Sequence, residues 1–421
     1  MLVRFPNLMQ SYAMEHFKEA AKEAEKIMRG VFERTPLQKN EHLSAIYGAD
    51  IWLKREDLSP VRSYKLRGAF NAMRKQDKNK LFVAASAGNH AQGVAYMCKH
   101  FGVKGTIFMP VTTPKKKKKK TEIFGGDAIQ IELVGDYFDD CLKAAQDFCK
   151  KNNGHFLSPF DDVDVIEGQA SVAVEIEAQL GFCPDHIVMP VGGGGLSAGV
   201  LNYFKNNAQY SLIEPLGGAS LWAALIAGRP VSLDKVDTFA DGAAVGQIGN
   251  KPFETLKSIG LANVLRAPED RVCITMLEML NVEGIVLEPA GALSIDALQD
   301  LGQAISGRTV VCITTGGNFD FERLPEVKER SQRFKGVKKY LILRMPQRPG
   351  ALKEFLNFLG PDDDITRFEY LKKSARNFGS ILIGIETKDP NHFGDFFDKL
   401  SNAGFTFSDI TNDETLAQFV I

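Results

Sequence analysis

The sequence has few cysteines and no closely spaced pair of them. Six occur among 421 residues, at Cys98, Cys141, Cys149, Cys183, Cys273 and Cys312. This spacing is typical of neither a zinc site nor a disulfide framework, and it suits a reducing cytosol. We accordingly predict no metal site.

Long apolar segments and an excess of basic charge are also missing. No run approaches the ~18 apolar residues of a membrane-spanning helix, and residues 1–10 are broken by Pro6 and lack the apolar core of a signal peptide. We therefore expect a cytoplasmic protein with no membrane partner. The net charge of −1 argues against nucleic acid as a main partner.

What is present is a long chain of ordinary globular composition, with 44% hydrophobic and 24% charged residues. Its length predicts two or three domains. Short apolar runs alternate with helical patterns from residue 81 onward, which predicts βαβ units and a largely parallel sheet covered by helices. The expected strands are 51–54, 81–85, 105–109, 128–134, 186–191 and 309–314, with helices over 11–29, 114–124, 137–151, 165–180 and from near Leu196.

One lysine in the stretch Ser63–Phe70 has the features of a nucleophile. Lys65 is expected at the start of a helix, close to Arg62 and Arg67. The positive end of the helix dipole and the two arginines would each disfavour its charged form, so that the free amine is reached near neutral pH. An ordinary surface lysine remains the alternative at this point.

Three polar loops follow predicted strands, at the sheet edge where ligands bind in α/β proteins. Ser86–His90 could present backbone N–H groups to an anion at a helix start. Gly192–Leu196 contains four consecutive glycines, which favours a phosphate cradle and matches no common nucleotide motif. Thr314–Asn318 places hydroxyls at the last strand. Each loop taken alone could be a plain strand-to-helix turn.

A lysine able to form a Schiff base, a phosphate cradle, an asparagine and a hydroxyl are together the groups that pyridoxal phosphate uses. The sequence also closely resembles the threonine dehydratases (threonine ammonia-lyases), which are fold-type II pyridoxal-phosphate enzymes. The matching motifs keep the family's order over about residues 30–325: Lys54–Leu58, Ser63–Ala69, Ser86–Gly93, Gly192–Leu196, Glu214–Pro215, Asp241–Ala243, Leu287–Ala292 and Thr315–Asn318. The resemblance implies an α/β catalytic core of two parallel-sheet subdomains, similar to tryptophan synthase β.

The resemblance also implies a role for each matching residue. Lys65 would be the catalytic lysine that links to the cofactor, and Tyr64 would pack beside the ring. Asn89 would bond the cofactor's 3′-oxygen, and Thr315, where the family commonly carries serine, would face the pyridine nitrogen. The phosphate would be bound by Gly192, Gly193, Gly194, Gly195 and Leu196, and the substrate carboxylate by Ser86, Ala87, Gly88, Asn89 and His90.

The implied reaction is β-elimination of L-threonine, and of L-serine, to 2-oxobutanoate or pyruvate and ammonia, with Lys65 removing the α-proton. The first of these begins isoleucine biosynthesis. Serine racemases, threonine synthases and cysteine synthases share the fold and cofactor and remain alternatives, as does a catalytically silent amino-acid sensor. The presence of Lys65, Asn89 and the glycine run argues against the sensor.

Two features near these motifs receive structural interpretations. Glu288, in a Glu-Pro-Ala-Gly sequence, is expected to begin a helix with its carboxylate at the positive end rather than to act in catalysis. The run Lys115–Lys120 follows a helix-start signature, so we favour a solvated helix face over a polyanion-binding patch.

The chain changes character after about residue 322. The order of expected elements is βαββαβ, a ferredoxin-like α+β unit, with strands over 339–345, 365–371, 380–386 and 405–408 and helices over 349–359 and 391–403. Two stretches, 348–352 and 365–370, resemble the ACT-like regulatory domain of threonine dehydratases. This implies feedback by isoleucine and a homotetramer, and the alternative is a pure oligomerisation module. We expect a catalytic domain over 1–325, a linker over 326–338 and a regulatory domain over 339–421.

Overall fold

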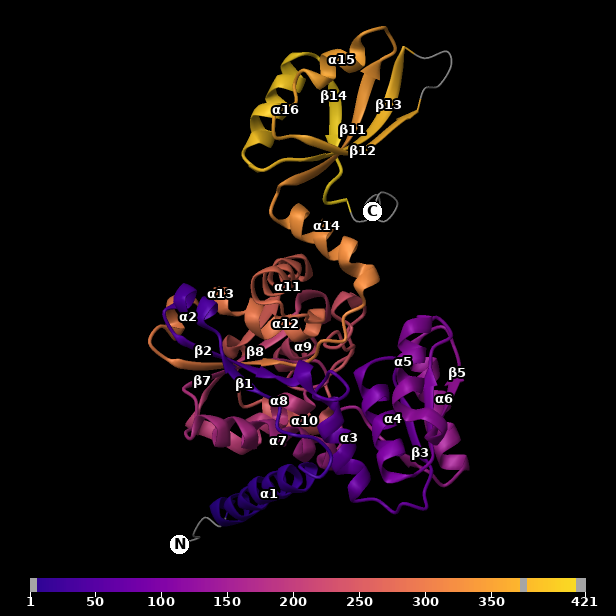
Figure 1. Cartoon of the computed structure of the whole chain (residues 1–421), viewed down its shortest axis with the longest axis vertical. Coiled ribbons are helices and arrows are strands. Elements are labelled where there is room, and N and C mark those ends of the chain that lie inside the picture. Colours follow the sequence, from indigo (N-terminus) through magenta and orange to yellow (C-terminus); the bar gives the residue numbers. More distant parts are fainter. Residues whose placement is uncertain (1–5, 372–376, 414–421) are drawn as a thin grey trace. The chain divides into compact units, whose positions relative to one another are not determined.

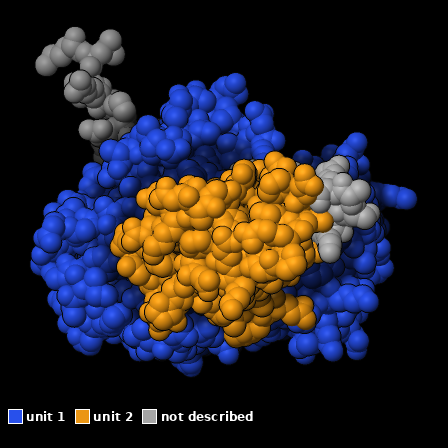
Figure 2. Space-filling view, turned by 90° about the horizontal axis from the view of Figure 1, so that it is seen from above, with its two compact units in different colours: residues 1–320 blue, residues 321–421 orange. Residues whose placement is uncertain are grey.

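The computed structural model of the chain describes residues 6–371 and 377–413. Its residues group into two units, 1–320 and 321–421, which Figure 2 colours blue and orange. Each unit has an apolar core of its own. In the part of the chain that is described, no helix is both long and apolar enough to cross a lipid bilayer.

The first unit contains two sheets, as the family resemblance implies. The larger has the strand order β1 (Leu37–Lys39), β2 (Asp50–Arg55), β10 (Thr309–Thr314), β7 (His186–Pro190), β8 (Gln209–Pro215) and β9 (Val264–Ala267). All of its pairings are parallel except that of β1 with β2. The smaller sheet is parallel throughout, in the order β5 (Ile129–Leu133), β4 (Gly105–Met109), β3 (Phe82–Ala85) and β6 (His155–Phe156).

Helices cover both sheets. They are α1 (Pro6–Met28), α2 (Glu41–Tyr47), α3 (Lys65–Arg74), α4 (Asn89–Phe101), α5 (Lys115–Gly125), α6 (Phe138–Lys151), α7 (Val163–Leu180), α8 (Gly195–Phe204), α9 (Ser220–Ala227), α10 (Asn250–Leu256), α11 (Glu269–Glu283), α12 (Pro289–Asp296) and α13 (Leu298–Leu301). Figure 1 shows α11 and α12 on one side of the larger sheet and α7, α8 and α10 on the other. Helix α3 packs against both α7 and α4, and so lies between the two sheets.

The strongest sequence signals were the strands that are buried on both faces. Strands β3, β4 and β7 are buried along their whole length, and such strands consist of nearly continuous apolar residues. The predicted strands and helices of the first unit are confirmed to within a few residues, apart from helix α1, which begins at Pro6. Strands β1, β6, β8 and β9 and the helices between β8 and β10 were not predicted.

The second unit is the predicted ferredoxin-like fold. Its antiparallel sheet has the order β12 (Asp364–Leu371), β13 (Phe378–Glu386), β11 (Lys338–Pro346) and β14 (Thr406–Asp409). Helices α15 (Ala351–Leu356) and α16 (His392–Asn402) share one apolar core with this sheet. Helix α14 (Leu324–Phe334) precedes β11 and lies in the segment that was expected to bridge two domains.

Candidate functional site

Lys65 is the first residue of α3, as the sequence predicts. Its Nζ donates to the carbonyl oxygen of Pro159 at 2.9 Å and lies 5.2 Å from the ring centre of Tyr64 and 5.9 Å from that of Phe160. Burial lowers the pKa of Lys65 to about 8, against an opposing effect of Glu288. The free amine is therefore accessible close to neutral pH.

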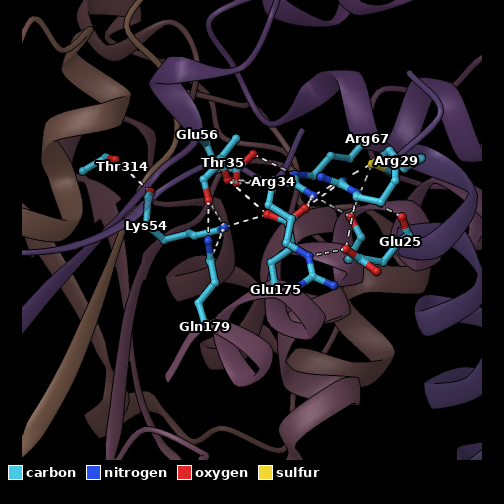
Figure 3. Close-up of polar contacts among 12 residues, drawn as sticks. Glu25, Arg29, Arg34, Thr35, Lys54, Glu56, Arg67, Glu175, Gln179 and Thr314 are labelled. Atoms are coloured by element: carbon cyan, nitrogen blue, oxygen red, sulfur yellow. Dashed lines mark hydrogen bonds and ion pairs between the residues drawn. The ribbon is translucent and has the colours of Figure 1, made fainter. Parts of the chain in front are cut away.

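The expected contribution of Arg62 and Arg67 to this pKa is wrong. Neither arginine is among the causes of the shift of Lys65, which come from burial and Glu288. Arg67 is instead fully buried and belongs to the cluster drawn in Figure 3, in which it donates to Glu56 at 2.8 Å and to Glu175 at 2.7 Å. These carboxylates balance the positive charge of Arg67, which explains why it has no effect on the pKa of Lys65.

This buried cluster fixes the helix that carries Lys65. Glu175, on α7, accepts hydrogen bonds from Arg67 of α3, from Lys54 of β2 at 2.6 Å and from Arg29 at 2.8 Å (Figure 3). Although burial alone would raise the pKa of Glu175, Arg67 and Lys54 lower it, so the carboxylate stays charged. The cluster joins α3, α7 and β2 and explains why Lys54 and Arg67 both occur in motifs around Lys65.

Asn89 begins α4 at the carboxyl end of the smaller sheet and meets two loops of the larger one. Its Nδ2 donates to Glu288 Oε1 at 2.7 Å, and its Oδ1 accepts from Asn318 Nδ2 at 2.6 Å. Asn318 also donates to the carbonyl oxygen of Val61 at 2.9 Å, close in sequence to Lys65. The loops after β3 and β10 therefore converge on one site, as the sheet-edge argument predicts.

The side chain of Glu288 contacts Asn89, whereas the sequence predicted only a helix-start role for it. It immediately precedes α12, as expected, but its side chain makes no capping hydrogen bond and binds Asn89 instead. Burial raises the pKa of Glu288 to about 7, assisted by Asp241 and opposed by the hydrogen bond from Asn89. A buried carboxyl whose pKa is raised toward neutrality, bonded to an asparagine that the sequence predicts to bind the cofactor, makes Glu288 a candidate site residue.

The glycine turn leaves buried N–H groups without partners. A Cβ on Gly193 would lie 2.1 Å from the Phe160 ring, and one on Gly192 would lie 2.9 Å from the Ala243 carbonyl oxygen. Gly194 has φ 84°, a conformation that favours glycine. Within the described residues, no acceptor receives a hydrogen bond from the N–H groups of Gly193 to Leu196. Buried backbone donors without partners at the start of α8 are suited to an anion.

Ser86, Ala87 and Gly88 form the half-buried loop after β3, where the Ser86 hydroxyl accepts from the N–H of Gly88 at 3.1 Å. His90 is buried and paired with the carbonyl oxygen of Leu157 at 2.9 Å. Burial, with a smaller effect of Lys65, lowers the pKa of His90 to about 3, so its ring is neutral at physiological pH. The imidazole therefore carries no charge to a substrate.

Thr315 lies beside the Lys65 stretch at the end of β10. Its carbonyl oxygen accepts from the N–H of Tyr64 at 3.2 Å, and its hydroxyl donates to the carbonyl oxygen of Ala290 at 3.2 Å. The residue is buried. The third predicted loop therefore contacts the backbone next to Lys65.

The interpretation of Lys115–Lys120 as a solvated helix face is wrong for two of its members. The run does form the expected helix, α5, and Lys119 is exposed. Lys117, however, binds the carboxylate of Asp241, and Lys120 donates to Asn318 Oδ1. Two lysines of the run therefore face the site.

Comparisons with known proteins agree with this site. Residues 28–316 match the family described as pyridoxal-phosphate dependent enzyme, and residues 329–420 match the C-terminal regulatory domain of threonine dehydratase. The chain is 46% identical over 402 residues to the L-threonine dehydratase biosynthetic IlvA of Bacillus subtilis, which covers 94% of this chain and 95% of that protein. The chain belongs to the pyridoxal-phosphate-dependent threonine dehydratases.

Solved structures with this fold include other threonine dehydratase relatives and a racemase. The processed form of threonine deaminase isoform 2 from Solanum lycopersicum superposes with a TM-score of 0.71 at 33% identity, over 76% of this chain and 94% of that chain. A serine racemase from Dictyostelium discoideum has a TM-score of 0.65 at 27% identity, over 72% and 98% of the two chains. The fold is therefore shared between dehydratases and racemases, and the regulatory domain is what marks this chain as a threonine dehydratase.

The residues of this threonine dehydratase fit pyridoxal phosphate. The donor set contains a primary amine for the aldehyde, at Lys65, and unpaired buried N–H groups for the phosphate, at Gly193 to Leu196. The amide of Asn89 completes it with a donor for a ring oxygen. Phe160 lies between the lysine and the glycine turn, since its ring faces Lys65 Nζ and packs against Gly193.

Proposed function

We propose that this protein eliminates water from L-threonine and that the resulting enamine is hydrolysed, so that one water molecule is taken up, ammonia is released and 2-oxobutanoate is formed; L-serine gives pyruvate in the same way. The observation that carries the proposal is a half-buried lysine amine, whose partial removal from water lowers its pKa to about 8, held where the partnerless N–H groups and the Asn89 loop converge. The relatives named biosynthetic threonine dehydratase support the substrate. The product 2-oxobutanoate would enter isoleucine biosynthesis, as the family resemblance implies.

The cofactor-binding residues are proposed as follows. Lys65 links covalently to the cofactor, the N–H groups of Gly192 to Leu196 bind its phosphate, Asn89 bonds a ring oxygen and Tyr64 packs beside the ring. Thr315 would bond the ring nitrogen with the hydroxyl that donates to the carbonyl oxygen of Ala290 in this structure. When bound, pyridoxal phosphate supplies an electron-withdrawing ring that acidifies the α-carbon of the substrate.

The chain's own groups would then act on the substrate. The N–H groups of Ser86 to His90, at the start of α4, bind its carboxylate, which the helix terminus favours electrostatically. The amine of Lys65, free again once the substrate amine has replaced it on the cofactor, would take the α-proton, since its lowered pKa leaves a useful fraction unprotonated near neutral pH. The neutral ring of His90 stays bound to Leu157 and holds the start of the helix in place.

The second unit supports a regulatory site for an aliphatic amino acid. A cavity of about 340 Å³ is lined by Met345, Pro346, Arg348, Gly350, Ala351, Leu352, Lys353, Leu356 and Tyr370. Its apolar side chains suit a branched aliphatic group, and Arg348 and Lys353 suit a carboxylate. We propose isoleucine as the effector, because residues of both stretches that resemble ACT-like domains line the cavity.

The chain is divided into domains, and the protein is expected to assemble from several copies of it. We propose a catalytic domain over 1–325, a linker over 326–338 that includes most of α14, and a regulatory domain over 339–421, supported by family matches to 28–316 and 329–420. We also propose a homotetramer in the cytoplasm, on the family resemblance. Light scattering on purified protein would measure the assembly.

The function is tested by incubating the purified protein with L-threonine and measuring 2-oxobutanoate and ammonia. We expect equimolar formation of both, and a fall in rate as isoleucine is added. Formation of D-serine from L-serine without ammonia would assign a racemase instead. Absence of any turnover with bound cofactor would favour the silent amino-acid sensor.

A further inference from the structure

Three lysines of α5 contact residues outside their own subdomain. Lys116 is largely exposed, and its Nζ lies 3.7 Å from Asp320 Oδ1. The other two are one turn apart. Lys117 binds Asp241, and Lys120 binds Asn318, which follows β10 of the larger sheet. Lys119, on the same helix, is exposed. The lysine run is therefore divided between a face that meets the site and a face that meets solvent.

Lys120 begins a directed chain of hydrogen bonds. An ammonium group has donors and no acceptor, so the atom of Asn318 that it contacts must be the oxygen Oδ1. The amide nitrogen of Asn318 then faces the other way and donates to Val61 O at 2.9 Å and to Asn89 Oδ1 at 2.6 Å. The oxygen of Asn89 is thereby occupied, and its nitrogen donates to Glu288 Oε1 at 2.7 Å.

The direction of this chain decides what Asn89 offers to a ligand. An amide nitrogen carries two N–H groups, and among the described residues Asn89 Nδ2 donates only to Glu288. The second N–H is available as a donor to a bound oxygen. If Asn318 and Asn89 turned over, a carbonyl oxygen would take that place, and two acceptors would face each other.

We propose that Lys120 is a positioning residue that fixes the amide orientations of Asn318 and Asn89, so that Asn89 presents a donor to the ring oxygen of the cofactor. The inference rests on the proposed role of Asn89 beside pyridoxal phosphate. Lys120 itself touches neither cofactor nor substrate in this scheme. It gives the lysine run of α5 a function that a solvated helix face does not have.

The test compares Lys120→Met, Lys120→Arg and the exposed-face control Lys119→Met. Methionine removes every donor and keeps an unbranched side chain, and arginine remains donor-only. Apo-protein is titrated with pyridoxal phosphate, and the dissociation constant and the position of the visible absorbance band are measured. We expect Lys120→Met to weaken cofactor binding about tenfold, equivalent to about 1.4 kcal/mol, and to shift the band.

Two control variants, the kinetic constants and the thermal midpoints distinguish a positioning role of Lys120 from a general loss of stability. Lys120→Arg should recover most of the affinity, and Lys119→Met should match the wild type. With L-threonine, kcat of Lys120→Met should fall by more than KM rises, because the lost interaction orients the cofactor rather than holding the substrate. The thermal midpoints of the apo-proteins should agree.

The same affinity and absorbance in Lys120→Met and Lys119→Met would overturn the proposal, as would equal losses in Lys120→Met and Lys120→Arg. If Lys120→Met does not fold, the isosteric Asn318→Asp carries the test, since it lacks the N–H groups that donate to Asn89. It should show the same band shift, and an unchanged band would overturn the proposal. Failure of the proposed function is a separate result, in which wild-type protein takes up no cofactor or forms no 2-oxobutanoate.

Discussion

At the scale of single residues, the chemistry depends on how burial changes ordinary side chains. Burial lowers the pKa of Lys65 from 10.5 to about 8 and raises that of Glu288 from 4.5 to about 7. In both cases burial disfavours the charged form of the group. Each pKa therefore moves toward neutral pH, where a group can both take up and release protons. The two residues interact electrostatically, since Glu288 opposes the lowering at Lys65.

The pKa of Lys65 predicts the pH dependence of cofactor uptake. Protonated amine does not react with an aldehyde, so the rate of capture should rise with pH through a midpoint of about 8 and level off above it. An exposed lysine would show the same rise near 10.5, its ordinary value. Stopped-flow absorbance after mixing apo-protein with pyridoxal phosphate across this pH range measures the midpoint. A midpoint near the ordinary value would contradict the lowered pKa of this half-buried amine.

At the scale of elements, close packing places the glycine turn against the Lys65 site. Strand β7 leads into the turn and α8 follows it, and the ring of Phe160 fills the space in which a side chain at position 193 would lie. The glycines are therefore required by close approach of neighbouring groups, and the same packing leaves the N–H groups at the helix start unpaired.

Gly193→Ala should be damaging for this reason. The added Cβ would lie 2.1 Å from the Phe160 ring, so either the turn or the ring must move. We expect a loss of roughly 1–3 kcal/mol in the free energy of unfolding, typical of overpacking, together with weaker cofactor binding. Chemical denaturation and cofactor titration measure the two effects. The double variant with Phe160→Ala should regain stability, and no recovery would show that the ring is not the obstacle.

The buried cluster around Glu175 predicts a second stability effect. Glu175→Gln would leave Arg67, Lys54 and Arg29 without their shared carboxylate in the protein interior. Removing one partner of a buried ion pair costs about 3–5 kcal/mol. Urea denaturation should show a loss of this order and displacement of α3 should lower cofactor affinity. The control is Glu177→Gln on the same helix, whose partly exposed carboxylate should cost no more than about 1 kcal/mol.

The sequence reached some of these features and missed others for physical reasons. Strands such as 105–109 were predictable because a strand buried on both faces is apolar throughout. Lys65, Asn89 and the glycine turn were found because their motifs are local. The contact of Asn89 with Glu288 spans 199 residues, and that with Asn318 spans 229, so no local pattern reveals them. The predicted effect of Arg67 on Lys65 was wrong because its carboxylate partners, Glu56 and Glu175, come from other elements and no local pattern reveals them.

At the scale of the whole molecule, two units with separate cores would perform catalysis and regulation. The cavity in the second unit is lined by residues of β11, α15 and β12. Regulation requires that effector binding there changes the affinity or rate at the Lys65 site, which is a coupling free energy between two sites. Such coupling is established by measurement on the full chain.

Tyr370→Ala tests this coupling. Tyr370 lines the cavity and is 41% exposed, so its removal should leave the fold and the uninhibited rate unchanged. We expect the isoleucine concentration that halves the rate to rise roughly tenfold, as for the loss of an aromatic contact of about 1.5 kcal/mol. Titration of isoleucine at fixed threonine measures this. An unchanged isoleucine response would remove this cavity as the effector site.

The most direct test of the whole account is to locate the cofactor on the chain. Holoenzyme is treated with borohydride, which makes the lysine–cofactor link permanent, and is then digested and mapped by mass spectrometry. The account predicts a pyridoxyl-phosphate label on the peptide that contains Lys65, and its absence in Lys65→Ala, which should also lose visible absorbance and turnover. A label on another lysine, or none on any, would contradict it.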